Sequence, residues 1–337
     1  MLKSLEKYTF ENEATYAAKG YRGLNIKGKI KFFYILMSND LKLQQFMANA
    51  LKKKECYIGP FIGEFGNFLL HMLPFIGFLH ESGIKVHYCG LANHKPFLID
   101  QNGEKIYHSF TELNDFFHEV RPSGNTIDYL PQDVEKQVTE FQSRAKYGKY
   151  PYLDIFSNSN LYWYSYRNWQ LQGRQFIYDL GKFYNSEKTK KDKVVIFPRK
   201  MTTEYTANNG GAWDYMKLAN LLTQYFKEVV FVGHPSMSSD LNIGSSSTIK
   251  LALSTDNTSM LDQCASASLI VTQHSGAMHV GGYTNTPVLL IFNGNPPIQG
   301  LEDSIRFRVN FPATPVNIAF SYEQINIYCK HHSASSR

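Results

Sequence analysis

The chain has 337 residues, of which 43% are hydrophobic and 19% are charged. This length indicates about two domains, and the composition excludes a chain that is largely disordered. The formal net charge of +6 suits anionic ligands or an anionic membrane surface without choosing between them. The 4 cysteines are far apart and form no CxxC pair, which predicts buried thiols of a reducing compartment instead of a disulfide framework or a zinc site.

The N-terminal segment gives no sign of export. Its first 23 residues lack the apolar core of a signal peptide, so we expect a cytoplasmic protein with at most peripheral membrane contact. Residues 57–79 approach the length of a membrane span, but their polar residues and glycines fit a buried strand, loop and helix better. Residues 23–30, GLNIKGKI, nearly spell a phosphate-binding P-loop; because the final Ser or Thr is missing, we predict a turn.

The first clear unit spans residues 56–89. A strand, the glycine-rich loop GPFIGEFG, a helix over 68–80 and a second strand over 84–89 predict a βαβ unit of a doubly wound sheet. The glycine spacing is not that of a dinucleotide-binding loop, and Gly90 follows the second strand where an acidic residue would hold a ribose. An oxidoreductase of Rossmann type is therefore disfavoured.

Within this loop, Glu64 stands between Gly63 and Phe65, with Gly66 close behind, where the first strand opens into a crevice. Partial burial would raise the pKa of the Glu64 carboxyl towards the range in which it works as a general base. The alternative is an exposed loop glutamate or a charge that stabilises the start of a helix. The residues leave both interpretations open.

The middle of the chain is less regular. Residues 98–107 predict a hairpin and 133–144 a polar helix, whereas 161–179 are dense in aromatic residues with two interleaved arginines. Such side chains can stack on bases or sugar rings. No nucleic-acid module signature accompanies them, so we expect packing and no nucleic-acid partner.

A polar stretch at 185–193 predicts the linker to a second domain. Strands over 194–197, 229–233, 248–252, 267–271 and 288–292 alternate with helices over 213–226 and 259–267, which predicts a parallel sheet. We therefore expect a first domain over 1–185 and a second over 193–320. In the remainder, 321–337, SYEQ predicts a capped helix that could pack back on the first domain.

The turn after the strand 267–271 predicts a phosphate site. Ser275 is a preferred helix N-cap, Gly276 lets a ligand approach the backbone, and His279 lies about one helical turn further on. A helix that starts at the carboxyl end of a parallel strand directs N–H groups at such a ligand. A cap followed by a half-buried histidine explains the same residues, and both readings stay open.

Three further residues follow strands of the second domain at the same edge. Arg199 and Lys200 follow the first strand and His234 follows the second, so we expect them to line the crevice with His274 and Ser275. Two cations and a helix start would suit a nucleotide diphosphate. Surface charge is the alternative for Arg199 and Lys200.

The stretch HSGAMHVGGYTNTPVLLIF, residues 274–292, resembles the GT-B glycosyltransferases, particularly family nine, the heptosyltransferases. That family has a [DS]-[ST]-G-x-x-H turn before a helix and then a strand of the form PV-apolar-apolar-F-G. The match is close over some twenty residues and loose over about two thirds of the chain. His274 departs from the pattern, and Glu64 stands where the family has an aspartate.

The resemblance implies two Rossmann-like domains that face a central cleft, and transfer of a sugar with inversion and without a metal. The donor would be a nucleotide-diphosphate sugar held by Ser275, Gly276 and His279 with Lys200 or Arg199, and no cofactor is expected. The acceptor would be a glycan or glycolipid hydroxyl deprotonated by Glu64. A non-catalytic nucleotide-sugar-binding module and an epimerase or hydrolase of nucleotide sugars remain as alternatives.

Overall fold

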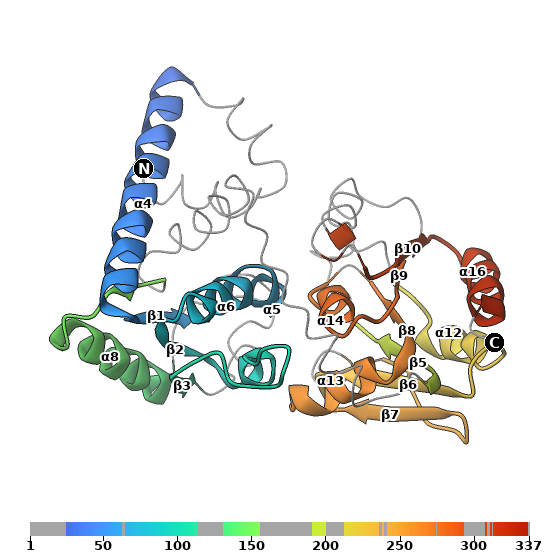
Figure 1. The fold of residues 1–337 in the computed structure, drawn as a ribbon. Helices are drawn as coiled ribbons and strands as arrows, with labels where there is room; N and C mark the ends of the chain where they lie inside the picture. Colours follow the sequence, from blue (N-terminus) through green and yellow to red (C-terminus); the bar gives the residue numbers. More distant parts are fainter. Residues whose placement is uncertain are drawn as a thin grey trace.

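The computed structural model describes residues 25–62, 65–113, 131–155, 191–199, 212–235, 238, 241–273, 275–292, 307–308, 311 and 313–335. These residues form two α/β domains, each built on a parallel sheet, which lie side by side (Figure 1). The first sheet has 4 strands and the second has 6. The predicted architecture of two parallel-sheet domains is confirmed.

The first sheet has the strand order β3-β2-β1-β4. Its strands are β1 (Glu55–Phe61), β2 (Lys85–Leu91), β3 (Ser109–Leu113) and β4 (Tyr152–Leu153). Its helices are α4 (Ile26–Lys53), α5 (Phe65–Asn67), η2 (Phe68–Met72), α6 (Leu73–Glu81), η3 (Ala92–Phe97) and α8 (Gln132–Tyr147). The predicted βαβ unit, the polar helix and the hairpin, closed by the antiparallel bridge Ile99↔Lys105, are all confirmed.

The helix predicted over 68–80 is present but changes its winding. The turn η2 is π-helical, and α6 continues directly from it with Pro74 as its second residue. Single π-helical turns are rare and frequently mark functional sites. Here η2 faces the second domain, as described below.

The helix α4 corrects an expectation. Residues 26–30, which we predicted as part of a turn, begin this 28-residue helix, and Asn25 caps it by accepting a hydrogen bond from the Gly28 N–H at 2.9 Å. Only the C-terminal half of α4 shows one-sided apolar spacing, with Leu43, Phe46 and Ala50 buried in the core. The N-terminal half is apolar on most sides, so periodicity gave no signal there.

The second sheet has the strand order β10-β9-β8-β5-β6-β7, and all its paired strands are parallel. Its strands are β5 (Lys191–Phe197), β6 (Glu228–Gly233), β7 (Ile249–Leu253), β8 (Ala267–Thr272), β9 (Val288–Ile291) and β10 (Val316–Ala319). Its helices are α12 (Tyr215–Leu222), α13 (Asn257–Ala265), α14 (Ala277–Tyr283) and α16 (Tyr322–Ser335). The order of the five predicted strands is confirmed, and β10 is an additional strand that the sequence analysis did not predict.

The strand β5 begins earlier than predicted. The charged residues from Lys191 to Lys193, which we assigned to the linker, are its first residues. Lys193 is buried, and the burial of its charge is tolerated because its ammonium donates to Gln263 Oε1 at 2.9 Å and to Ser266 Oγ at 2.6 Å. Residues 185–190 and the aromatic stretch 161–179 lie outside the described residues.

The predicted capping of α16 is present, but its predicted docking on the first domain is wrong. The Gln324 N–H donates to Ser321 Oγ at 3.2 Å, and Gln324 Oε1 accepts from the Phe320 N–H at 2.7 Å. Ile325 and Cys329 of this helix are buried in the core of the second domain. Figure 1 shows α16 on the side of the second domain that faces away from the first.

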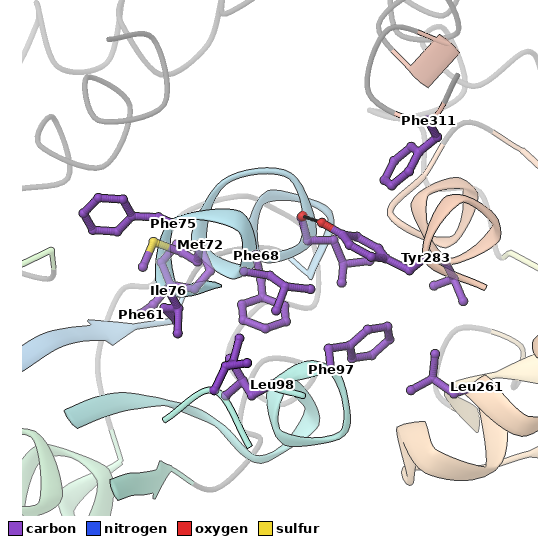
Figure 2. Packing of buried hydrophobic residues seen from close by; sticks show 14 of the residues in the cluster. Phe61, Phe68, Met72, Phe75, Ile76, Phe97, Leu98, Leu261, Tyr283 and Phe311 are labelled. Carbon is purple, nitrogen blue, oxygen red and sulfur yellow. Dashed lines mark hydrogen bonds between the residues drawn. The ribbon is translucent and has the colours of Figure 1, made fainter. Parts of the chain in front are cut away.

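The two domains share one apolar core. Phe68 and Phe97 of the first domain and Leu261 and Tyr283 of the second belong to the same buried cluster (Figure 2). Hydrogen bonds between described residues also cross the junction: the Tyr283 hydroxyl donates to the Leu69 carbonyl in η2 at 2.5 Å, and Asn257 Nδ2 donates to the Asn93 carbonyl at 2.7 Å. The domains are therefore packed directly on one another.

All 4 cysteines are free and buried, as predicted from their spacing. Burial raises the pKa of Cys56, Cys89 and Cys329 to about 12, so these thiols stay neutral near pH 7. In the ranges described above, none of the helices combines the length and apolar character that crossing a membrane requires.

We expect Tyr283→Phe to loosen the junction between the domains. The substitution removes the bond to the Leu69 carbonyl at a cost of about 1 kcal/mol and leaves the ring packed. Amide hydrogen exchange should become faster in η2 and α14. Tyr225→Phe is a matched control, because Tyr225 bonds Asn326 within the second domain; unchanged exchange in η2 and α14 of Tyr283→Phe would contradict the prediction.

Candidate functional site

The strand order of the second sheet reverses between β5 and β8. From β5 the chain adds β6 and β7 on one side, and β8, β9 and β10 follow on the other. In open parallel sheets, ligands bind outside the carboxyl ends of the strands at such a reversal. Arg199 follows β5 and Ser275 follows β8, so two predicted donor residues lie on the two loops of this switch point.

The first sheet has its own reversal between β1 and β4. From β1 the chain adds β2 and β3 on one side, and β4 pairs with β1 on the other. The loop after β1 is the predicted acceptor-side loop. Of its residues, Gly66 lies in α5, and Gly63 and Glu64 lie outside the described residues.

The loops of the two switch points touch through two glycines. A methyl group added to Gly276 would lie 2.8 Å from the backbone nitrogen of Gly66 and 2.9 Å from its Cα. A methyl group added to Gly66 would lie 3.1 Å from the Cα of Gly276. A side chain at position 276 would therefore require the two backbones to move apart, and one at position 66 would make a tight contact. Gly276 therefore allows a close approach of the Gly66 backbone, and the predicted approach of a ligand to Gly276 stays a prediction.

Tyr215 holds the two loops of the second switch point together. Its buried hydroxyl donates to Gln273 Oε1 at 2.7 Å and accepts from the Arg199 N–H at 3.0 Å. Burial raises the pKa of Tyr215 to about 12, so the hydroxyl remains protonated and keeps donating at neutral pH. The backbone of Arg199 is thereby fixed beside the turn that starts α14.

The start of α14 is more internally bonded than the sequence suggested. The Ala277 N–H donates to Ser275 Oγ at 3.2 Å, the Met278 N–H to the Ser275 carbonyl at 3.2 Å and the His279 N–H to the Gly276 carbonyl at 3.1 Å. The Ser275 hydroxyl thus accepts from the first N–H of α14, but the N-cap position itself is Gly276 and not Ser275 as predicted. These three N–H groups, which we expected to point at a ligand, are paired within the turn, so the binding of an anion here would depend on the preceding N–H groups and on nearby cations.

His279 is 6% exposed. Its ring lies 6.1 Å from that of Phe307 and 6.5 Å from that of Phe311, centroid to centroid. These surroundings are closer to the alternative of a histidine that follows a helix cap, although the ring is buried and not half-buried as that alternative stated. Donation from His279 to an anion stays a prediction.

Of the three remaining predicted donor residues, the structure describes only His234. His234 follows β6, next to β5, and is half-buried, with its carbonyl accepting from the Ser238 hydroxyl at 3.4 Å. It thus lies at the same edge of the sheet as Arg199 and Ser275. Lys200 and His274 lie outside the described residues.

Sequence reasoning missed Tyr215, Gln273 and the buried His94. Gln273 directly precedes the predicted motif and could have been included, whereas nothing in the local sequence marks Tyr215. His94 in η3 stacks on Phe68 of η2 with ring centroids 3.9 Å apart. Burial lowers its pKa to about 3, so it adds no positive charge to the junction at neutral pH.

Known proteins resemble this chain in fold and not in sequence. The sequence matches no protein-family model and no curated protein. The structure of the E. coli heptosyltransferase WaaC with ADP is similar to this chain with a TM-score of 0.50 and 10% sequence identity, over 84% of this chain and 99% of that one. The chain has the GT-B fold.

Two other structures that resemble this GT-B chain are weaker matches. The E. coli ADP-heptose lps heptosyltransferase II has a TM-score of 0.48 and 14% identity, over 84% of this chain and 99% of that chain. The glycosyl transferase family 9 structure from Veillonella parvula has a TM-score of 0.47 and 10% identity, over 82% and 88%. Within the described ranges, no group of 3 or more His, Cys, Asp or Glu side chains could hold a metal ion.

We expect Gly276→Ala to push the two switch-point loops apart. The added methyl group would meet backbone atoms of Gly66, which no rotamer change can relieve, and the cost should be about 1–3 kcal/mol. The melting temperature should fall, and any activity of the site should also fall, because the substitution displaces the loops that form it. Gly244→Ala is the matched control, because a methyl group at Gly244 meets nothing within 4 Å. Equal melting temperatures for both variants would contradict the prediction.

Proposed function

We propose that this protein is a glycosyltransferase that moves a sugar from a nucleotide-diphosphate sugar to a hydroxyl of a glycan or glycolipid. The observation that carries the proposal is the Gly66–Gly276 contact, which brings the switch points of both GT-B sheets to one junction. A reaction between two substrates needs both to be held in one geometry. Because ligands bind at switch points, two switch points in contact would hold the two substrates next to each other.

The donor diphosphate would bind the second domain. Arg199 would supply a cation to the Ser275–Gly276 turn. The Tyr215 network supports this role, because it ties the Arg199 backbone to Gln273 just before that turn. Lys200, His234, His274 and His279 complete the proposed donor set. The WaaC structure, which shares the GT-B fold, is a complex with ADP, and this supports a nucleotide as the ligand here.

The acceptor hydroxyl would bind the first domain beside the loop after β1. Glu64 immediately precedes Phe65, and Phe65 Cδ1 would lie 3.4 Å from a methyl group added to Gly276. In the proposed step, Glu64 takes the hydroxyl proton as the acceptor oxygen bonds to the anomeric carbon. The bond from that carbon to the diphosphate breaks on the opposite face, which inverts the configuration.

Charge on the leaving nucleoside diphosphate would be stabilised by Arg199, Lys200 and the dipole of the turn, without a metal ion. The junction of apolar side chains around Phe68 and Tyr283 would limit the access of water to the donor. We place this chemistry in the cytoplasm, with at most peripheral membrane contact and no nucleic-acid partner.

Two other functions use the same fold. A non-catalytic nucleotide-sugar-binding module would need the donor site alone, and an epimerase or hydrolase would convert the donor without an acceptor. The loop after β1 packs against the Ser275–Gly276 turn of the proposed donor site. This packing favours transfer over both alternatives, because neither of them requires a binding site for a second substrate at the junction.

We expect Arg199→Gln to weaken the binding of nucleoside diphosphates by about 10–100-fold, because a charge-assisted hydrogen bond is lost. A thermal-shift screen of the wild type first identifies the nucleoside diphosphate that raises the melting temperature most. Calorimetric titration of that ligand then compares the variants. Arg144→Gln, at an exposed position of α8, removes the same charge elsewhere and should bind like the wild type. Unchanged affinity in Arg199→Gln would remove it from the donor site.

We expect Glu64→Gln to lower the rate of sugar transfer by about 10²–10⁴-fold while leaving nucleoside diphosphate affinity unchanged, because only proton removal is affected. Mass spectrometry of donor and products, with and without acceptors, measures the rate. Glu81→Gln, at the exposed end of α6, is the control. Turnover of the donor without any acceptor would favour the epimerase or hydrolase, and donor binding with no turnover in the wild type would favour the binding module.

A further inference from the structure

The helix α4 exposes a row of large apolar side chains. Among the α4 side chains that the structure describes, the most exposed apolar ones are Ile26, Ile30, Tyr34, Met37 and Leu41, which are 77%, 65%, 74%, 63% and 56% exposed. Spacings of four and three residues put all five on one helical face, the apolar stripe of α4. Its core-facing residues, Leu43, Phe46 and Ala50, lie on the opposite side. Folding of the described domains therefore leaves this stripe uncovered.

The same helix also accounts for the net positive charge of the chain. Residues 25–54, which are α4 with its caps, contain 7 lysines and a single acidic residue, Asp40. Taking these from the 35 basic and 29 acidic residues of the chain leaves 28 of each. The entire formal net charge of +6 therefore belongs to α4 and its caps. Lys27 and Lys42 are exposed and directly follow Ile26 and Leu41 of the stripe.

We propose that α4 docks the protein on an anionic lipid membrane, with the apolar stripe between the headgroups and the lysines against them. An exposed apolar face with flanking lysines is the pattern of a helix that lies in the plane of a membrane interface. Charge selects this occupant, because anionic lipids attract clustered lysines whereas a second copy of α4 would repel them. The helix lies on the surface, since α4 falls short of the apolar character of a membrane span.

The position of α4 leaves room for such docking. Its principal contacts are with β1 and β4, and the buried residues Leu43, Phe46 and Ala50 all belong to its C-terminal half. Figure 1 shows the N-terminal half extending beyond the sheet of the first domain. The inference goes beyond the proposed function and does not depend on it, because membrane binding needs neither donor nor acceptor.

Flotation with vesicles tests the proposal without any sugar substrate. The full chain should float with vesicles of phosphatidylcholine mixed with phosphatidylglycerol, bind less to phosphatidylcholine alone, and dissociate as salt is raised. The triple variant Ile30→Ser, Tyr34→Ser, Met37→Ser should bind at least about tenfold more weakly at unchanged net charge. The triple variant Tyr147→Ser, Leu251→Ser, Ile327→Ser removes three other exposed apolar side chains and should bind like the wild type.

Charge is tested separately. Lys27→Gln with Lys42→Gln should weaken binding by about fivefold for each lysine removed, because each contributes its own attraction to the anionic surface. Lys136→Gln with Lys146→Gln removes two exposed lysines of α8 and serves as the control. All variants should have the melting temperature of the wild type, since every substituted residue is exposed or outside the core.

Three outcomes would overturn the proposal. The first is that the wild-type chain does not float with anionic vesicles. The second is that the stripe variant and its control lose binding equally. The third is a dimer in light scattering that the stripe variant dissociates, without vesicle binding, which would assign the stripe to a second copy of the chain. Because donor binding is not measured, failure here leaves the proposed function untouched, and failure of the proposed function leaves this test intact.

Discussion

The contact between Gly66 and Gly276 is the constraint on which the arrangement of the two domains depends. A Cβ on Gly276 would force the Gly66 backbone to move and a Cβ on Gly66 would be tight, so the loop after β1 and the turn before α14 meet backbone to backbone. The buried cluster around Phe68 and Tyr283, together with the bonds from Tyr283 to Leu69 and from Asn257 to Asn93, holds that contact in place. Apolar packing supplies the affinity between the domains, and the glycines set how close they come.

Polar groups then fix the loops that border the contact. Tyr215 connects Arg199 to Gln273, and the Ser275 hydroxyl closes the first turn of α14. Because these bonds are made within the second domain, its loops are ordered before any ligand arrives, which lowers the entropy lost on binding. The same bonds use up N–H groups that a phosphate would otherwise meet, so the cations of this edge carry more of the proposed recognition.

Much of the fold could be predicted from local sequence patterns, whereas the junction between the domains could not. Short β-branched runs such as Ala267–Thr272 predicted buried parallel strands, because both faces of such a strand are covered. Helix α4 was missed since its N-terminal half is apolar on most sides, and α16 was misplaced since a capping box fixes where a helix starts but not where it packs. The role of Tyr215 and the approach of Gly66 to Gly276 join residues far apart in sequence, which no periodicity records. The chemistry of Glu64 and the donor set remains predicted.

The strand β1 joins the two proposals in one rigid element. Its first residue, Glu55, follows the C-cap of α4, and its last, Phe61, leads into the loop beside Gly276. At about 3.3 Å per residue, the strand spans roughly 20 Å. A membrane-docked α4 would therefore fix the height of the acceptor-side loop above the lipid surface. An acceptor anchored in that surface would then need to reach only this height, which favours a glycolipid over a free glycan as the acceptor.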